Sequence, residues 1–380
     1  MARFFATCSS GLEETLAAEL AGPRIGATGI APGSSGVWFS GGQETGYRAN
    51  LWLRSAVRVL VELERARVRD PDELYRFASD IDWENLMKVD QTLAVDCRLR
   101  DSGITHSKYA ALKVKDAICD RFRRITGRRP DVDVEAAHLP LFLYLWRDEA
   151  TLYRDMSGQT LHKRGYRGAV HRAALSEAVA AGILQMIGFD GTQDIVDPMC
   201  GSGTFVIEAA LIATERAPGL LRRRSFPFEH WPFHDATLWE RLRREAREAA
   251  RDRPGCRILG ADSHPGAITL ARRDADAAGV SRQIELVEAD IEDLTLAATP
   301  QLVVTNPPWG ERLDAADAVE SWRRLGHFLK ASAQGARAHV LCGNADLSRH
   351  LGLKSARRRP LSISRVDCRM LEYEIQARER

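Results

Sequence analysis

The sequence has no long hydrophobic run, no paired-cysteine motif and very little lysine. No apolar stretch in its 380 residues approaches the roughly 18–20 residues of a transmembrane helix. The first residues do not resemble a signal peptide, because Arg3 precedes only a short apolar stretch and Glu13 and Glu14 follow soon after. These absences predict a cytoplasmic protein that does not enter a membrane.

The seven cysteines form no CxxC pair, and their number is odd. Most of them lie in segments that we expect to be apolar strands or helices, which favours reduced core thiols over disulfides or zinc. We therefore expect no metal site. Cys200 lies in a glycine turn where a nucleophile is conceivable, but no histidine can be paired with it, and we interpret it as a packing residue.

Only seven of the 54 basic residues are lysine, and the formal net charge is +2. The chain as a whole is therefore not a polycation, but its arginines are clustered, and arginine suits bidentate phosphate contacts and stacking on bases. Genome base composition could produce the same bias. With 44% hydrophobic and 28% charged residues, the chain fits a globular protein of two domains.

The stretch that points most directly to chemistry is DPMCGSGTFVIEAA, which begins at Asp197. A buried strand is expected before it and an apolar helix after it. In an open α/β sheet such a turn lies at the carboxyl edge of the strands, where ligands bind. Gly201 and Gly203 allow close approach and positive φ, and the following helix presents unpaired N–H groups to an anion.

The turn lacks the residues of two common phosphate-binding loops. Thr204 and Phe205 stand where a phosphate loop has lysine, and Val206 replaces the third glycine of a dinucleotide fingerprint. What remains is a small ligand with a carboxylate for the helix end and a cation near Asp197, and S-adenosylmethionine has both groups. The alternative is a structural turn whose glycines serve geometry alone.

A second candidate corner, Asn306-Pro307-Pro308-Trp309-Gly310, follows the strand expected at 301–305. The prolines stiffen this corner, so the Asn306 side chain and the Pro307 carbonyl can face one site as fixed acceptors. Two acceptors on an exocyclic amine draw its nitrogen toward tetrahedral geometry and make it nucleophilic. Trp309 would hold the base by stacking. The alternative is a structural strand exit with Trp309 in the core.

The pair DPMCGSGT and NPPWGERL resembles the class I S-adenosylmethionine-dependent methyltransferases that modify exocyclic amines. More closely, the chain is similar to the RlmL-type 23S rRNA guanine-N2 methyltransferases, which carry a THUMP RNA-binding domain before the catalytic domain. FFATCSSGLEETLAAEL, LHKRGYR and APGLLRRRSFPFEHW extend the similarity over nearly the whole chain. The resemblance implies S-adenosylmethionine as cofactor, RNA as partner, and a catalytic role for Asn306, Pro307, Pro308 and Trp309.

The resemblance implies an α+β N-terminal RNA-binding region, ferredoxin-like plus THUMP, followed by an α/β Rossmann-like class I methyltransferase domain. We expect the ferredoxin-like subdomain at 1–45, the THUMP domain at 46–157, a linker at 158–175 and the catalytic domain at 176–380. Alternating strands and helices in the last part indicate a parallel doubly wound sheet. Its strands are expected at 194–197, 257–262, 283–288, 301–305 and 338–342, with a closing hairpin of 363–370 and 371–375.

Two carboxylates complete the predicted cofactor site. Asp262, at the end of the second strand, is placed to accept both ribose hydroxyls, and Asp290 is placed to meet the adenine amine. Each could instead be only a helix cap. The predicted cofactor-binding residues are Asp197, Met199, Cys200, Gly201, Ser202, Gly203, Thr204, Asp262, Ser263, Asp290, Ile291 and Asn306.

Basic residues gather on a helix expected at 108–124, in the linker, and in an aromatic and basic insertion at 218–254. On the helix, the basic side chains are expected to form a phosphate-tracking surface. The side chains expected to face the core are Ala111, Leu112, Ala117, Ile118 and Phe122. A solvated helix face is the alternative. The predicted RNA contacts are Lys113, Arg121, Arg124, Arg128, Lys163, Arg164, Arg167, Arg222 and Arg223.

Together these patterns predict methyl transfer to guanine N2 in 23S rRNA, without a metal. A tRNA guanine-N2 methyltransferase with the same domain pair is the nearest alternative, and a non-catalytic RNA-binding assembly factor is an alternative of another class. A DNA adenine-N6 methyltransferase shares the NPPW turn, but no separate DNA-reading domain is predicted. A glutamine-N5 protein methyltransferase would have a helical N-terminal part.

Overall fold

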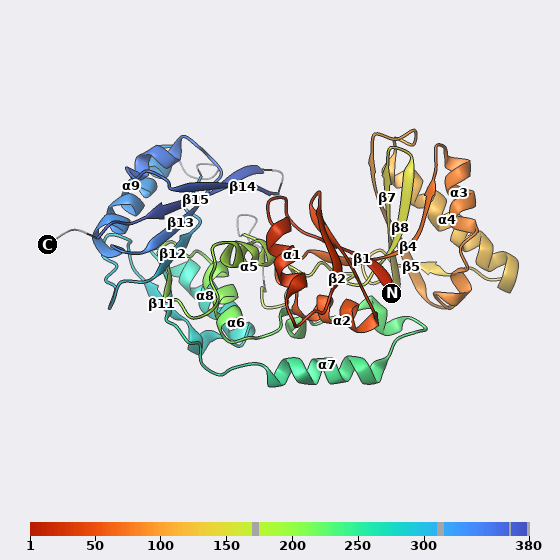
Figure 1. Ribbon diagram of the computed structural model, residues 1–380, viewed down its shortest axis with the longest axis horizontal. Helices are drawn as coiled ribbons and strands as arrows, with labels where there is room; N and C mark the ends of the chain where they lie inside the picture. The colour runs from red at the N-terminus through yellow and green to blue at the C-terminus, as the bar shows by residue number, and fades with distance from the viewer. Residues whose placement is uncertain (169–174, 310–314, 365, 378–380) are drawn as a thin grey trace. The chain divides into compact units, whose positions relative to one another are not determined.

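The computed structural model describes residues 1–168, 175–309, 315–364 and 366–377. The chain divides into two compact units, which are labelled by element in Figure 1. The N-terminal unit comprises Met1–Thr7, Ala17–Leu161 and Arg223–Arg244, and the C-terminal unit comprises Cys8–Leu16, His162–Arg222 and Glu245–Arg380. Within the described ranges, no helix is both long and apolar enough to cross a bilayer.

The N-terminal unit is built on one eight-stranded sheet with the order β2-β3-β1-β4-β8-β7-β5-β6. β4 pairs with β1 on one side and with β8 on the other, so a single sheet runs from the ferredoxin-like part into the THUMP part. The strands are β1 (Ala2–Thr7), β2 (Thr28–Gly33), β3 (Gly36–Gly41), β4 (Arg58–Arg67), β5 (Thr92–Arg100), β6 (Asp131–Val132), β7 (Leu139–Trp146) and β8 (Glu149–Asp155). The sequence did not predict β2, because a proline and two glycines weaken its pattern; as an edge strand it tolerates them.

The helices of this part are α1 (Glu13–Ala21), α2 (Gln43–Trp52), α3 (Pro71–Ser79) and α4 (Ser107–Thr126). α4 ends at Gly127, which adopts the left-handed conformation of a C-cap. Its buried residues are Ala110, Val114, Ala117, Ile118, Cys119 and Phe122. Ala117, Ile118 and Phe122 are buried as predicted, and the half-buried Ala111 packs against the core. Leu112 is 54% exposed, so its predicted inward orientation was wrong.

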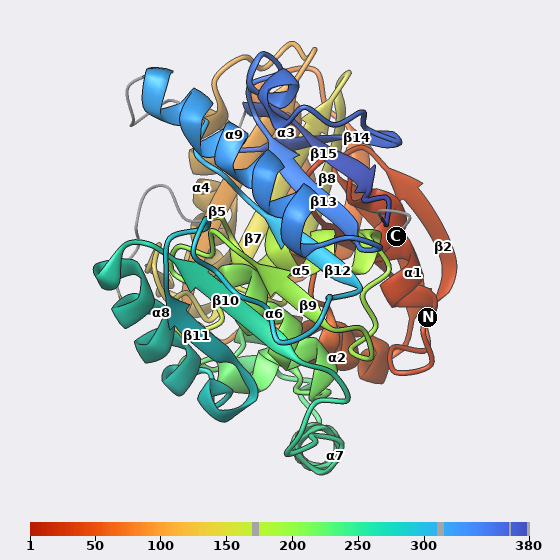
Figure 2. The same ribbon diagram turned by 90° about the vertical axis from the view of Figure 1, so that its left-hand side faces the viewer.

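The C-terminal unit contains a seven-stranded sheet with the order β11-β10-β9-β12-β13-β15-β14. The first five strands are parallel, and β15 pairs antiparallel with both β13 and β14, which confirms the predicted doubly wound α/β fold (Figure 2). The strands are β9 (Ile195–Asp197), β10 (Ile258–Asp262), β11 (Glu285–Glu288), β12 (Leu302–Thr305), β13 (Arg337–Cys342), β14 (Arg357–Ile363) and β15 (Val366–Glu374). The helices are α5 (Glu177–Met186), α6 (Thr204–Ala213), α8 (Pro265–Ala277) and α9 (Ala315–Ser332). α7 (Ala236–Glu248) belongs to the insertion, and most of it is assigned to the N-terminal unit.

The closing hairpin is present, but its predicted boundaries were wrong. β14 ends at Ile363 and β15 runs from Val366 to Glu374, so the chain turns near Ser364 and not after Met370. Met370 and Leu371 point to opposite faces of β15 and are both buried, so both faces of the strand are covered at this point. Two consecutive apolar residues interrupt the alternation of polar and apolar residues that a half-exposed strand shows. The prediction therefore placed the turn of the hairpin between them.

Candidate functional site

The two candidate corners leave neighbouring strands at the same edge of the sheet. β9 and β12 are parallel, with Ile195 opposite Leu302 and Val196 opposite Val303. The chain proceeds from β9 to β10 and β11 on one side and then returns to β12 on the other. The strand order therefore reverses between β9 and β12, and such a switch point is where ligands bind in open α/β sheets.

The glycine turn after β9 is held in place by the end of β10. The Cys200 N–H donates to the Ala261 carbonyl at 2.8 Å, and the Gly201 N–H donates to Asp262 Oδ2 at 2.9 Å. Gly201 and Gly203 have φ values of 55° and 76°. A Cβ at Gly201 would point into open space, so the backbone is accessible there, as a ligand-binding turn requires.

Cys200 itself is buried, and burial raises the pKa of its thiol. The sulfur packs close to Gly260, where a Cβ would lie 3.2 Å from Sγ. A protonated, buried thiol is a poor nucleophile. Its environment is that of a packing residue.

Asp197 is buried at the end of β9, and its Oδ1 accepts the Met199 N–H at 3.2 Å. Burial raises the pKa of this carboxyl to about 7, the Thr305 hydroxyl and the Met199 N–H oppose the rise, and the Asp262 carboxylate adds to it. A cation bound beside Asp197 would favour the carboxylate form. This group is therefore suited to a ligand that carries a positive charge.

Asp262 is half-buried and holds the turn together through both oxygens. Oδ1 accepts the His264 N–H at 2.9 Å and Oδ2 accepts the Gly201 N–H. Each oxygen retains capacity for a further hydrogen bond, so ribose hydroxyls remain possible donors. The helix-cap alternative does not describe it, because the N-cap of α8 is His264; Ser263 between them is exposed.

Asp290 is already engaged on both oxygens. Arg324 of α9 donates to Oδ2 at 2.9 Å, and the Glu292 N–H donates to Oδ1 at 3.1 Å. Ile291 beside it is buried in the core under α9. Sequence reasoning missed Arg324, because nothing in its helix indicates a partner 34 positions earlier in the chain.

The Asn306 side chain carries an unusual acceptor. Its Oδ1 is buried and has no hydrogen-bond partner among the residues that the structure describes. An unsatisfied buried oxygen costs about 1–3 kcal/mol, so a ligand donor that fills it recovers that energy. Gly310, the last residue of the corner, lies outside the described residues, as do residues 311–314.

The corner is held rigidly by two indole groups. Trp322 of α9 donates to the Pro308 carbonyl at 2.9 Å, and Trp309 donates to the Leu341 carbonyl at 3.2 Å. A Cβ at Gly343 would overlap the Trp309 ring, so the ring lies directly against that backbone. Trp309 is half-buried, which combines the core packing and the exposed face that we had treated as alternatives.

The basic residues predicted to contact RNA differ in exposure. Arg124, Arg128, Lys163 and Arg223 are exposed, whereas Lys113 and Arg222 are half-buried. Arg121 is bound to its own unit: it pairs with Asp82 and Glu84 and donates to the Ser79 carbonyl at 3.0 Å. Its predicted phosphate contact does not agree with this arrangement, because two carboxylates already neutralise it.

The linker arginines are also internal, which contradicts their expected surface role. Arg164 is 1% exposed and lies 3.6 Å from the buried carboxylate of Glu208 on α6. Tyr166 donates its hydroxyl to the same carboxylate at 3.1 Å. Burial of the tyrosine, with Glu208 close by, raises the pKa of its hydroxyl. This cluster anchors the linker to α6.

Arg167 joins the linker to the start of the same helix. It donates to the Thr204 hydroxyl and to the Leu175 carbonyl, and it lies 3.6 Å from Glu177. Burial raises the pKa of Glu177, and Arg167 opposes that rise. Thr204 directly follows Gly203, so Arg167 braces the end of the glycine turn. Sequence reasoning missed Glu177 and Glu208, which sit in helices that look apolar.

The aromatic residues of the insertion pack within the N-terminal unit. Phe226 and Phe228 are buried, and Phe228 stacks on Tyr47 with ring centroids 4.4 Å apart. Trp231 donates to the His138 carbonyl at 3.1 Å, and the Arg154 guanidinium lies over its ring. These aromatic residues attach the insertion to the unit, and the RNA contacts expected at Arg222 and Arg223 stay predictions. No group of three potential metal ligands occurs in the described part of the chain.

Comparison with known proteins gives three family matches. Residues 164–372 match the family described as the RMKL-like methyltransferase domain. Residues 68–155 match the THUMP domain, and residues 3–60 match the RlmL ferredoxin-like domain.

Individual relatives are similar to this chain over nearly its whole length. The "Ribosomal RNA large subunit methyltransferase K/L" of Syntrophotalea carbinolica is 42% identical over 98% of this chain and 53% of its own length. The protein of the same name from Allochromatium vinosum is 40% identical over 99% of this chain and 52% of its own length. The chain thus spans about half the length of these curated relatives. The crystal structure of SMU.472 complexed with SAH is similar with a TM-score of 0.88 and 28% identity, over 100% of this chain and 99% of that one.

Proposed function

The chain belongs to the family of RMKL-like methyltransferases, and from this premise we propose that it transfers a methyl group from S-adenosylmethionine to the exocyclic N2 of a guanine in 23S rRNA. The names of the curated relatives support ribosomal RNA as the substrate, and the THUMP match supports RNA binding. SMU.472 in complex with SAH supports the methyl donor. A ribosomal substrate would place this activity in the cytoplasm.

The observation that carries the proposal is the buried, unpartnered Oδ1 of Asn306 at the switch point between β9 and β12. An acceptor with no donor inside the described protein fits a donor from a substrate. The glycine turn on the adjacent strand provides the matching half of the site.

The residues of the turn fit an amphoteric cofactor. Asp197 would face the cation, the accessible backbone at Gly201 would approach the ligand closely, and Asp262 would accept the ribose hydroxyls. When bound, S-adenosylmethionine supplies a methyl group on a positively charged sulfur. We also propose that Met199, Ser202, Thr204, Asp290 and Ile291 border this ligand.

In this proposal the corner orients the nucleophile. Asn306 Oδ1 and the Pro307 carbonyl accept the two N–H bonds of the guanine amine, and the exposed part of Trp309 stacks on the base. Because an amide oxygen is not a base, Asn306 positions the amine without removing its proton before transfer. Most of the acceleration then comes from orientation, and a paired base must first leave its duplex.

Tritium transfer from labelled S-adenosylmethionine to total bacterial RNA tests the proposal, together with calorimetry of cofactor binding. Asn306→Ala should lower transfer by roughly 10²-fold or more, the effect of removing one preorganised hydrogen bond, while cofactor affinity stays nearly intact. Asn85→Ala changes an exposed asparagine of the N-terminal unit and should keep full activity. Substantial transfer by Asn306→Ala would remove this residue from the mechanism. N2-methylguanosine appearing in tRNA alone would replace the proposed substrate.

A further inference from the structure

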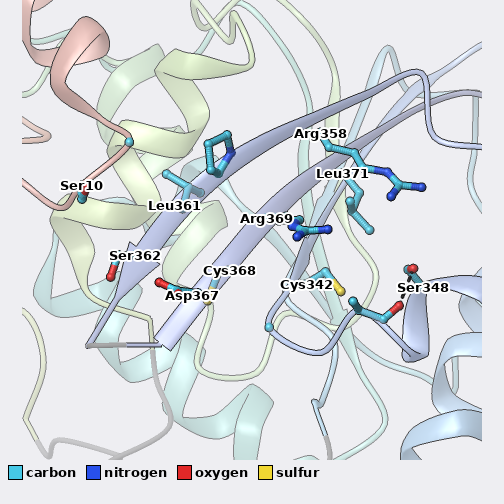
Figure 3. A pocket seen from close by; sticks show the side chains of 14 residues that line it. Ser10, Cys342, Ser348, Arg358, Leu361, Ser362, Asp367, Cys368, Arg369 and Leu371 are labelled. Carbon is cyan, nitrogen blue, oxygen red and sulfur yellow. Dashed lines mark hydrogen bonds between the residues drawn. The ribbon is translucent and has the colours of Figure 1, made fainter.

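A cavity of about 500 Å³ lies on the hairpin β14–β15 of the C-terminal unit (Figure 3). Its volume falls within the roughly 300–1,000 Å³ of small-molecule sites, so a nucleotide-sized group fits. The lining residues are Ser10, Gly11, Cys342, Gly343, Ala345, Ser348, Arg358, Pro360, Leu361, Ser362, Asp367, Cys368, Arg369 and Leu371. None of them belongs to the predicted cofactor-binding set.

Two arginines from neighbouring strands dominate the charge of this cavity. Arg358 lies opposite Leu371 and Arg369 lies opposite Pro360, so the two arginines are diagonal neighbours on one face of the hairpin. Both side chains line the cavity, and Figure 3 shows them away from Asp367 at the hairpin end. Diagonal positions are about 7–8 Å apart, within reach of two long side chains that converge on one group.

Neither guanidinium is neutralised by the described protein. No carboxylate of the described residues lies within 4 Å of Arg358 or Arg369. Arg358 donates its Nε to the Ser355 hydroxyl at 2.9 Å, which orients the guanidinium and leaves its terminal nitrogens available. Cys342 lies opposite Arg369 and lines the same cavity as both arginines. Burial raises the pKa of the Cys342 thiol, and both arginines oppose that rise.

The cavity adjoins the Asn306–Trp309 corner. Gly343 lines the cavity, and the Trp309 ring lies against Gly343. The opposite wall is the segment at Ser10 and Gly11, which is fixed by a hydrogen bond of 2.9 Å from the Ser362 N–H to the Ser10 carbonyl. The two arginines are therefore held at a defined place beside the corner that would receive the target base.

We propose that Arg358 and Arg369 bind one phosphodiester of the RNA strand, next to the nucleotide whose guanine enters the Asn306–Trp309 corner. The inference rests on the proposed function for the identity of the strand. Guanidinium groups match phosphate oxygens in charge and geometry, and the hydroxyls of Ser10 and Ser362 add further donors. The contact would fix the register of the strand, so that one guanine is presented to the corner.

The first test compares three variants of the full chain in binding a labelled RNA fragment that contains the methylated guanine. If the wild type methylates no RNA, the probe is a mixed-sequence single-stranded RNA. Arg358→Gln and Arg369→Gln should each weaken binding about tenfold. Their combination should also reduce the slope of log K against log [salt] by about 0.7, the value for one phosphate of a single strand.

Arg357→Gln is the matched control. Arg357 is an exposed arginine of the same strand, but it lies opposite Glu372 on the other face. It should retain RNA affinity, and all variants should bind S-adenosylmethionine as the wild type does. An equal loss in Arg357→Gln would show a general charge effect and overturn the site, as would unchanged binding in the double variant.

The second test replaces single phosphates of the probe by neutral methylphosphonates. One position should weaken wild-type binding about tenfold and have no further effect in the Arg358→Gln/Arg369→Gln variant, because both changes remove the same contact. A different result would assign the cavity to a free anion and overturn the proposal: inorganic phosphate abolishes RNA binding, but no methylphosphonate position weakens it. If the wild type transfers no methyl group but still shows this position-specific methylphosphonate effect, the proposed function is refuted and the phosphate site is retained.

Discussion

Cofactor binding should depend on pH through Asp197. Burial raises the pKa of this carboxyl to about 7 in the free protein. The positively charged part of S-adenosylmethionine favours the carboxylate, so binding lowers the pKa and releases a proton wherever Asp197 was protonated. Affinity should therefore rise with pH through 7 and level off above the pKa of the free protein.

The size of the effect follows from that pKa. With a pKa of about 7, the carboxylate fraction grows from roughly one tenth at pH 6 to roughly nine tenths at pH 8. If only the carboxylate form binds, the affinity should increase about tenfold across this interval, which corresponds to about 1.4 kcal/mol.

Isothermal titration calorimetry at pH 6 and pH 8, in two buffers of different ionisation enthalpy, measures both the affinity and the released protons. Asp197→Asn should bind more weakly and without this pH dependence. His264→Asn removes an imidazole near the turn but keeps a capping side chain, and it should retain the dependence. An affinity that is flat between pH 6 and pH 8 in the wild type, or one that falls, would refute the assignment of Asp197 to the ligand cation.

Two further predictions concern stability. Glu208→Gln should lower the free energy of unfolding by about 3–5 kcal/mol, because it removes the buried carboxylate beside Arg164. The double variant Arg164→Met/Glu208→Gln should lose less free energy of unfolding than Glu208→Gln alone. An equal or greater loss, measured by urea denaturation, would contradict the ion pair. Phe228→Ala should cost about 3–5 kcal/mol, since its ring is buried on Tyr47. Phe233, which is 68% exposed, is the matched control, and equal thermal shifts for both phenylalanines would refute the packing role of the insertion.

The features that the sequence predicted correctly are local. The glycine turn needs a strand before it and a helix after it, and the Asn306 corner needs only a strand exit. Each pattern consists of residues that are adjacent in the sequence. Their proximity followed from the rule that parallel strands end at one edge of the sheet, and the pairing of β9 with β12 agrees with it.

The features that the sequence did not reveal depend on partners far away in the chain. Arg121 and Arg164 were interpreted as surface cations because their neighbours in sequence are basic. The carboxylates that bind them, on Glu84 and on Glu208, come from other elements. The alternation rule likewise failed at Met370 and Leu371, where both faces of the strand are covered. The hydrophobic periodicity of a segment indicates which of its side chains face solvent. It does not indicate which distant segment packs against the buried ones.

The most direct test of the central claim is mass spectrometry of nucleosides from unmodified 23S rRNA, after incubation with the purified chain and S-adenosylmethionine. We predict one molecule of N2-methylguanosine per RNA with the wild-type chain and almost none with Asn306→Ala. Methylation at another atom, or equal yields from both proteins, would contradict the assignment of the Asn306 corner to a guanine amine.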